Sequence, residues 1–154
     1  MTDRNPLADT KLWMATAIPE PKNKNIHPQL GVHFEEVAEM IATLSGSDPE
    51  TGNLIANAHK ALEALGTHLK VSKDVVHIFP QDTVDYLDSL CDQIVTAVGC
   101  AHNHGFDIVG AMNEVNRSNF SKFDDNGYPI FNENKKIIKG PNYTPPDLKP
   151  YIKA

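Results

Sequence analysis

The chain has 154 residues, 40% of them hydrophobic and 22% charged, which is typical of one globular domain and excludes a disordered chain. Its net charge of −6 argues against binding to a nucleic-acid polymer through the surface as a whole. The sequence has no apolar run of about 18 residues and no secretory signal. We therefore expect a single domain over residues 1–154, in the cytoplasm and without a membrane partner.

The N-terminal part of the sequence predicts a loop region followed by a helix. Residues 1–29 are rich in Pro, Asn and Lys and lack a steady period, so we expect mostly loop, with at most a short helix near residues 12–17. Apolar residues then recur at intervals of three and four over residues 30–44. This spacing predicts the first helix of the core.

Three further helices are expected, each with a capping acid at its start. Asp48, followed by a proline, begins the second, Asp82 the third and Asp107 the fourth. Residues 93–106, at the end of the third helix, contain no Asp, Glu, Lys or Arg. We therefore expect this helix to be buried on several sides, either in its own bundle or against a second subunit of a homodimer or homotetramer.

The resulting fold class is all-α, with a four-helix core over residues 30–118 and irregular ends. The C-terminal segment, residues 119–154, mixes turn signals with short β-prone pieces and prolines, so we expect a small hairpin and a proline-rich tail. Residues 1–116 contain 7 basic and 16 acidic side chains, a net −9, whereas residues 117–154 contain 7 and 4, a net +3. An acidic body with a basic tail suits a site where metal ions meet phosphates, and a solvated tail is the simpler alternative.

Two of the expected helices carry rows of carboxylates beside their apolar stripes. Residues three or four apart share one face of a helix. One row is on the first helix and the other on the third: Glu35, Glu36 and Glu39, and Asp85, Asp88 and Asp92.

Such clustered charges need compensation, because a carboxylate pair 4 Å apart repels by about 4 kcal/mol at an effective dielectric constant of ~20. Between residues 25 and 116 the chain offers few basic partners, namely Lys60, Lys70 and Lys73. All-oxygen sites suit Mg²⁺ or Mn²⁺, so the sequence favours a divalent-metal site. A solvated acidic face is the alternative for either row taken alone.

Three segments resemble a known family. They are EEVAE (35–39), LDSLCDQIVTAVGCAHNHGFD (87–107) and EVNRSNFSKFDDNGYPIFNENKKIIKGPNYTPPDL (114–148). Together they are similar to the MazG-like all-α nucleoside triphosphate pyrophosphohydrolases, especially to short phage-type members, over roughly residues 30–148. The resemblance implies hydrolysis of a nucleoside triphosphate to the monophosphate and pyrophosphate, with two or three Mg²⁺ or Mn²⁺ ions per site.

The resemblance also implies roles for the acids of the first row. The family's metal-binding ExxE motif corresponds to Glu36 and Glu39. Glu35 matches an additional family glutamate that helps to bind metal or positions the attacking water. Glu35 and Glu36 are therefore the expected catalytic residues, and all three are expected metal ligands.

The acids of the second row depart from the family pattern. The family's ExxD motif places its aspartate at Asp92, but the position three residues earlier is Ser89 rather than glutamate. Asp88, one turn from Asp92, is the expected substitute, with Asp85 as the second possibility. This departure favours the alternative of a non-catalytic protein of the same fold that binds metal or nucleotide.

The resemblance further implies that Lys122 and Lys139 contact phosphates and that Asn119 assists by hydrogen bonding, with Arg117 and Lys136 as weaker candidates. Independently, Trp13 could stack on a base, although anchoring of the N-terminal segment is an equally good explanation. Some phage-type members, the MazZ branch, act on dGTP or GTP. We therefore expect dGTP or GTP as substrate, with other (d)NTPs as alternatives.

Overall fold

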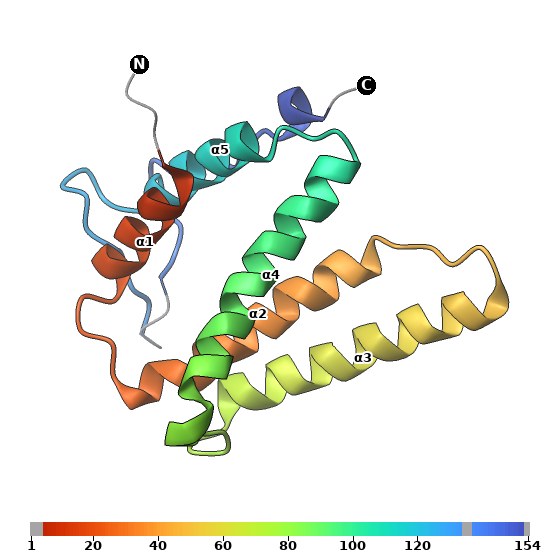
Figure 1. Ribbon diagram of the computed structural model, residues 1–154. Helices are drawn as coiled ribbons and strands as arrows, with labels where there is room; N and C mark the ends of the chain where they lie inside the picture. The colour runs from red at the N-terminus through yellow and green to blue at the C-terminus, as the bar shows by residue number, and fades with distance from the viewer. Residues whose placement is uncertain (1–4, 134–136, 153–154) are drawn as a thin grey trace. The chain divides into compact units, whose positions relative to one another are not determined.

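A computed structural model describes residues 5–133 and 137–152. Over these residues the protein is all-α, as predicted (Figure 1). One antiparallel bridge joins Phe131 and Ile137, and the described residues contain no longer strand, so the expected hairpin is reduced to this bridge. The helical elements are α1 (Pro6–Ala17), α2 (Asn23–Ala42), α3 (Pro49–Val71), η1 (Pro80–Asp82), α4 (Thr83–Asn103), α5 (Ile108–Phe120) and η2 (Lys149–Tyr151).

The prediction of mostly loop over residues 1–29, with at most a short helix near residues 12–17, underestimates the helix content, because α1 and the start of α2 lie within this range. The side chain of Asn5 accepts hydrogen bonds from the first turn of α1, and Pro6 occupies the first helical position, where its missing N–H is not needed. In α2, Pro28 lies inside the helix. Asparagine and proline were interpreted as helix breakers, but here they cap and start a helix or are tolerated within it.

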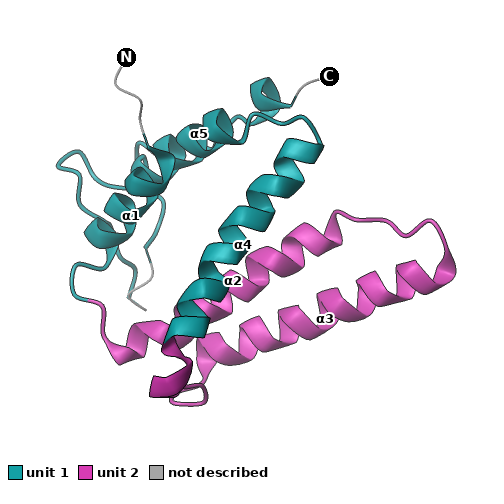
Figure 2. Ribbon diagram, viewed as in Figure 1, with its two compact units in different colours: residues 1–20, 84–154 teal, residues 21–83 magenta. Residues whose placement is uncertain are grey.

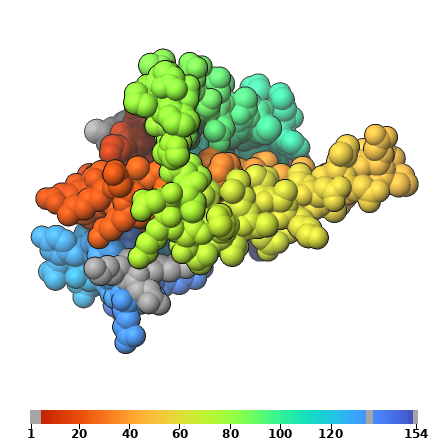
Figure 3. Space-filling view, turned by 90° about the horizontal axis from the view of Figure 1, so that it is seen from below, coloured from red at the N-terminus to blue at the C-terminus, as the bar shows by residue number. Residues whose placement is uncertain are grey.

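The chain divides into two compact units (Figure 2). Unit 2, residues 21–83, is a hairpin of α2 and α3, and the loop between these helices forms its tip (Figure 3). The helices approach closely where two glycines meet, since a Cβ on Gly31 would lie 2.7 Å from the carbonyl oxygen of Gly66. Ala38 and Leu69 are buried in the seam. As predicted, Asp48 caps α3, accepting a 2.8 Å hydrogen bond from the Thr51 N–H.

A buried histidine fixes the segment that leaves α3. His27 of α2 uses both ring nitrogens, because Nδ1 accepts the N–H of Asp74 at 3.1 Å and Nε2 lies 2.7 Å from the carbonyl oxygen of Val76. Asp74 has a positive φ of 53°, a conformation that this side chain tolerates better than most. His27 therefore ties the connector after α3 back to the first turns of α2.

Unit 1 contains α1, α4, α5 and the C-terminal segment, and within it α1 packs against α5. Asn116 of α5 is buried at this contact, where it donates to the carbonyl oxygen of Pro6 at 2.8 Å and accepts from the hydroxyl of Thr10 at 2.9 Å. Buried amides are stable only when paired in this way. The contact therefore fixes the N-terminal helix to α5 through specific hydrogen bonds.

The C-terminal segment follows a polar stripe along α5. Residues 140–147, which we call the C-terminal strap, are hydrogen-bonded to side chains of α5 and of its C-cap residue Ser121. Ser118 Oγ donates to the carbonyl oxygen of Thr144 at 2.9 Å, and the N–H of Thr144 donates to Ser121 Oγ at 3.0 Å. Arg117 donates to the carbonyl oxygen of Pro145 at 3.1 Å. The proline-rich tail is thus an ordered part of unit 1.

The predicted starts of α4 and α5, directly after Asp82 and Asp107, are confirmed. Gly105, with φ of 73°, separates the two helices, and Asp107 caps α5 by accepting from the N–H of Gly110 at 3.0 Å. The expected burial of α4 is not met within its own unit, because α4 packs against neither α1 nor α5. Of the α4 side chains only Ala101 is buried.

Candidate functional site

The three glutamates of α2 differ in their surroundings. Glu36 and Glu39 lie one turn apart and are exposed, so both carboxylates can accept a ligand from solvent. The side chain of Glu35 is only 27% exposed, and its carboxylate forms an ion pair with Nζ of Lys70 on α3. The first acidic row therefore splits into an exposed pair and one glutamate held by the neighbouring helix.

The ion pair between Glu35 and Lys70 depends on how closely α2 and α3 approach. A Cβ on Gly66 would lie 2.8 Å from Cγ of Glu35, so a larger residue there would displace the glutamate side chain. The sequence identified Lys70 as one of three possible basic partners but could not select it. Lys70 is the partner of Glu35 because of the register of the two helices, and the contact between Gly31 and Gly66 sets this register.

The acids of α4 lie in unit 1, on an exposed helix. Asp85, Asp88 and Asp92 are all exposed, and their spacing places them along one face of α4. The serine at the family's glutamate position, Ser89, uses its carbonyl oxygen to accept from the side chain of Gln93 at 3.1 Å. Asp88 and Asp92, four residues apart, form the second exposed pair of carboxylates.

The described residues of neither unit, taken alone, gather three or more His, Cys, Asp or Glu side chains as a metal site requires. The α2 pair belongs to unit 2 and the α4 pair to unit 1. In chemical terms both pairs offer carboxylate oxygens, the ligands that suit Mg²⁺ or Mn²⁺.

Three of the expected substrate-binding residues meet in unit 1. Nζ of Lys122 donates to Oδ1 of Asn119 at 2.8 Å and lies 5.6 Å from the centroid of the Trp13 ring. The indole N–H of Trp13 donates to the carbonyl oxygen of Asn119 at 2.9 Å. Trp13 also stacks on the buried Phe123, with ring centroids 5.9 Å apart and planes 3° from parallel. Residues over 100 positions apart thus form one cluster.

The fourth expected residue, Lys139, borders this cluster through the backbone. The N–H of Gly140, the next residue, donates to the carbonyl oxygen of Lys122 at 3.1 Å. Nζ of Lys139 lies 4.5 Å from the ring centroid of Tyr143. Lys136, a weaker candidate, lies outside the described residues.

Arg117, the other weaker candidate, is engaged within the protein. Its guanidinium bonds to Glu114 at 2.7 and 2.8 Å and reaches the strap at Thr144. The hydrogen bonds from Arg117 and from the N–H of Asp147 lower the pKa of Glu114 from 4.5 to about 2. We call these contacts of Glu114 and Arg117 with the strap the Glu114 clamp. It was not predicted from the sequence, although the i, i+3 spacing of Glu114 and Arg117 was a visible signal.

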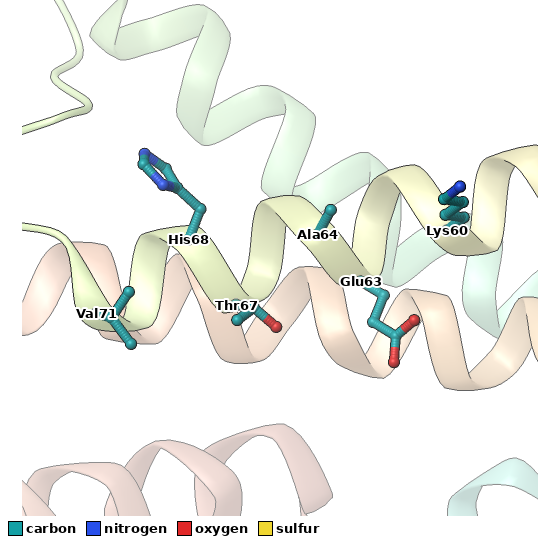
Figure 4. Close-up of a pocket in the computed structure, with 6 residues that line it drawn as sticks. All are labelled: Lys60, Glu63, Ala64, Thr67, His68 and Val71. Atoms are coloured by element: carbon teal, nitrogen blue, oxygen red, sulfur yellow. The ribbon is translucent and has the colours of Figure 1, made fainter.

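A surface depression of about 590 Å³ lies elsewhere, along α3 (Figure 4). All its lining residues come from this one helix: Lys60, Glu63, Ala64, Thr67, His68 and Val71. A depression on one helix does not enclose a ligand, and it contains none of the expected site residues. The candidate residues are therefore the acidic pair of unit 2, the acidic pair of unit 1 and the Lys122 cluster of unit 1.

No protein-family model matches this chain, and neither a curated protein nor a solved structure matches it. Within the part of the chain that the structure describes, no helix combines the length and apolar character that a membrane span requires.

Proposed function

We propose that this protein is a MazG-like pyrophosphohydrolase of the phage type. It would hydrolyse a (deoxy)nucleoside triphosphate to the monophosphate and pyrophosphate with Mg²⁺ or Mn²⁺, and dGTP or GTP is the preferred substrate. The observation that carries the proposal is the pair of exposed carboxylates, one turn apart, on each of two helices: Glu36 with Glu39, and Asp88 with Asp92. The proposal includes a four-helix core, a homodimer or homotetramer, and the host cytoplasm as location.

In this proposal the acids hold the metal ions and the basic cluster holds the phosphates. Two or three divalent ions bound by these carboxylates would offset the acidic body and make a bound water more acidic. Glu35, held by Lys70, positions the water that attacks the α-phosphorus. The bond from the α-phosphorus to the bridging oxygen breaks, and the leaving pyrophosphate accepts hydrogen bonds from Lys122. Asn119 keeps the Lys122 ammonium in place.

The test is pyrophosphate release from each dNTP and NTP, with and without Mg²⁺. We expect release that requires metal, is fastest with dGTP or GTP, and is lost in Glu36→Gln and Asp92→Asn. Glu63→Gln, which removes an exposed glutamate of α3, is the matched control and keeps activity. Absence of product from every triphosphate, with the protein folded and metal bound, would contradict the proposal.

Two observations favour a second candidate, a non-catalytic protein that binds metal or nucleotide. The carboxylate of Glu35 is already neutralised by Lys70, and Ser89 offers no carboxylate at the family's glutamate position. Such a protein would bind Mn²⁺ or nucleotide, and Glu36→Gln would weaken that binding, but no pyrophosphate would be released.

A further inference from the structure

The contacts of the Lys122 ammonium differ from those of two other basic side chains, which are paired with carboxylates. Lys70 is paired with Glu35, and Arg117 is paired with Glu114. Lys122 instead bonds to the amide oxygen of Asn119 and lies near the ring of Trp13. Among the described residues, no carboxylate lies within ion-pairing distance of its ammonium. The half-buried Lys122 thus has an oriented ammonium whose charge no described carboxylate neutralises.

This arrangement favours an anionic ligand. An aromatic ring attracts a cation through its quadrupole and carries no net charge, so it does not repel an incoming anion as a carboxylate would. An ammonium has three N–H donors, and the bond to Asn119 uses one of them. The remaining donors and the full positive charge suit the oxygens of a phosphate.

The indole is itself fixed on two sides, which makes it a rigid support. Its N–H is bonded to the carbonyl oxygen of Asn119, and its ring stacks on Phe123, which is 3% exposed. Because Trp13 comes from α1 while its partners lie at the end of α5 and in the residues just after it, the ring brings the N-terminal helix to the basic cluster. With its N–H and a stacking partner already engaged, its role differs from stacking on a base.

The same kind of contact recurs where the chain enters the strap. Lys139 also has an aromatic partner, Tyr143, and the adjacent Gly140 is hydrogen-bonded to the backbone of Lys122. A Cβ on Gly140 would lie 2.8 Å from that carbonyl oxygen, so this close contact requires glycine. Two lysines with aromatic partners on hydrogen-bonded segments suit a ligand with several charges, such as a diphosphate, better than a single carboxylate.

We propose that Trp13 is a positioning residue, which orients the Lys122 ammonium, together with Asn119, to bind the pyrophosphate portion of a polyphosphate ligand. The inference rests on the proposed function for the identity of the substrate, but the anion site itself does not require turnover. Trp13 is the only tryptophan of the chain, so its fluorescence reports directly on this site.

The experiment titrates the full-length protein with inorganic pyrophosphate and Mg²⁺, with orthophosphate in parallel. We expect a saturable change in Trp13 fluorescence with pyrophosphate and a much weaker response to orthophosphate. Calorimetry then measures pyrophosphate affinity in Lys122→Met, Trp13→Leu and both combined. Lys11→Met, which removes one positive charge from α1, is the matched control and keeps wild-type affinity.

The double-mutant cycle separates positioning from other roles. We expect Trp13→Leu to weaken pyrophosphate binding about two- to tenfold in the wild-type background, the range of a cation–π contact, and to have no further effect in Lys122→Met. The same loss in both backgrounds would overturn the inference. Trp13→Phe keeps a ring, so we expect a smaller loss, again confined to proteins with Lys122. This variant decides the question if Trp13→Leu unfolds.

Failure of the inference and failure of the proposed function give different results. If no triphosphate is hydrolysed but the cycle shows coupling, the proposed function fails and the anion site stands. If triphosphates are hydrolysed and Trp13→Leu binds pyrophosphate as tightly as the wild-type protein, the function stands and the role of Trp13 is refuted.

Discussion

Lys70 of α3 forms an ion pair with Glu35 of α2 and thereby neutralises the one glutamate of its row that is not exposed. The pair lies next to the glycine contact between the helices, so both partners are held in one register. In the proposed reaction this pair keeps Glu35 in position for the attacking water. The contact thus connects the packing of unit 2 with the chemistry expected at its acidic face.

Replacing Lys70 by methionine tests this connection. The pair is partly exposed, so we expect the free energy of unfolding to fall by less than ~1 kcal/mol. A misplaced Glu35 should lower kcat for pyrophosphate release by roughly ten- to a hundredfold with little change in KM. Initial rates and urea denaturation measure the two effects. Lys60→Met on the same helix is the control, and an unchanged kcat in Lys70→Met would show that the pair is only structural.

The close approach of α2 to α3 predicts that a substitution at Gly66 lowers the free energy of unfolding, whereas one at Gly52 raises it slightly. In Gly66→Val the new side chain meets Gly31 O and Glu35 Cγ, each at 2.8 Å, so we expect a loss of about 1–3 kcal/mol. A Cβ on Gly52 meets nothing within 4 Å, and Gly52→Ala should stabilise α3 by roughly 0.5–1 kcal/mol. Urea denaturation followed by circular dichroism measures both. Equal effects of the two variants would contradict close packing at Gly66.

Local signals predicted the helices well, because caps and terminators act within a few residues. Asp48 and Asp107 cap α3 and α5 as expected, and Gly105 takes the left-handed conformation between α4 and α5. The N-terminal helix was predicted too short, because its first turns are held by partners distant in sequence. Asn116, more than 100 residues away, bonds to Pro6 and Thr10.

The sequence identified residues of the candidate site, but it could not predict which of these side chains contact one another. Spacing alone identified the acidic pairs, and the resemblance selected Lys122 and Asn119. That Lys70 pairs with Glu35, and that Trp13 faces Lys122, depends on tertiary packing, which spacing within one helix does not encode. The metal assignment remains a prediction, and so does the substrate.

The Glu114 clamp predicts that the stability of the folded protein falls in acid. The pKa of Glu114 is about 2 in the folded protein, below its ordinary value of 4.5, so the unfolded chain binds the proton more tightly. Its contribution to stability is therefore complete above pH 4.5 and is lost as the pH falls towards 2. We expect Glu114→Gln to be less stable than the wild-type protein above pH 4.5.

The difference between Glu114→Gln and the wild-type protein should shrink as the pH falls from 4.5 towards 2. Urea midpoints measured across this range provide the test. Glu133→Gln, an exposed glutamate of unit 1, is the control and should follow the wild-type curve at each pH. A constant difference between Glu114→Gln and wild type at all pH values would contradict the assigned pKa.

The departure at Ser89 predicts an order among the aspartates of α4. Asp88 and Asp92 lie one turn apart, whereas Asp85 lies two turns from Asp92, too far along the helix to share one ion with it easily. We expect Asp88→Asn and Asp92→Asn each to weaken Mn²⁺ binding by at least about 10–100-fold and Asp85→Asn to have a smaller effect. Calorimetric Mn²⁺ titration of the full-length protein measures this, and the reverse order would assign the ligand to Asp85.

The apolar face of α4 predicts self-association. Its stripe follows the three–four spacing of a helix that packs against other helices. Within its own unit this face stays uncovered; Leu87, for example, is 62% exposed. The stripe consists of Val84, Leu87, Cys91, Ile94 and Val98.

We expect the wild-type protein to be a dimer or tetramer and Ile94→Lys to shift it towards the monomer, because the seam would have to bury an unpaired ammonium. Thr96→Lys adds the same charge on the opposite side of α4 and should leave the mass unchanged. Size-exclusion chromatography with light scattering gives the masses. If wild type and Ile94→Lys have the same mass while both remain folded, the stripe is not the subunit interface.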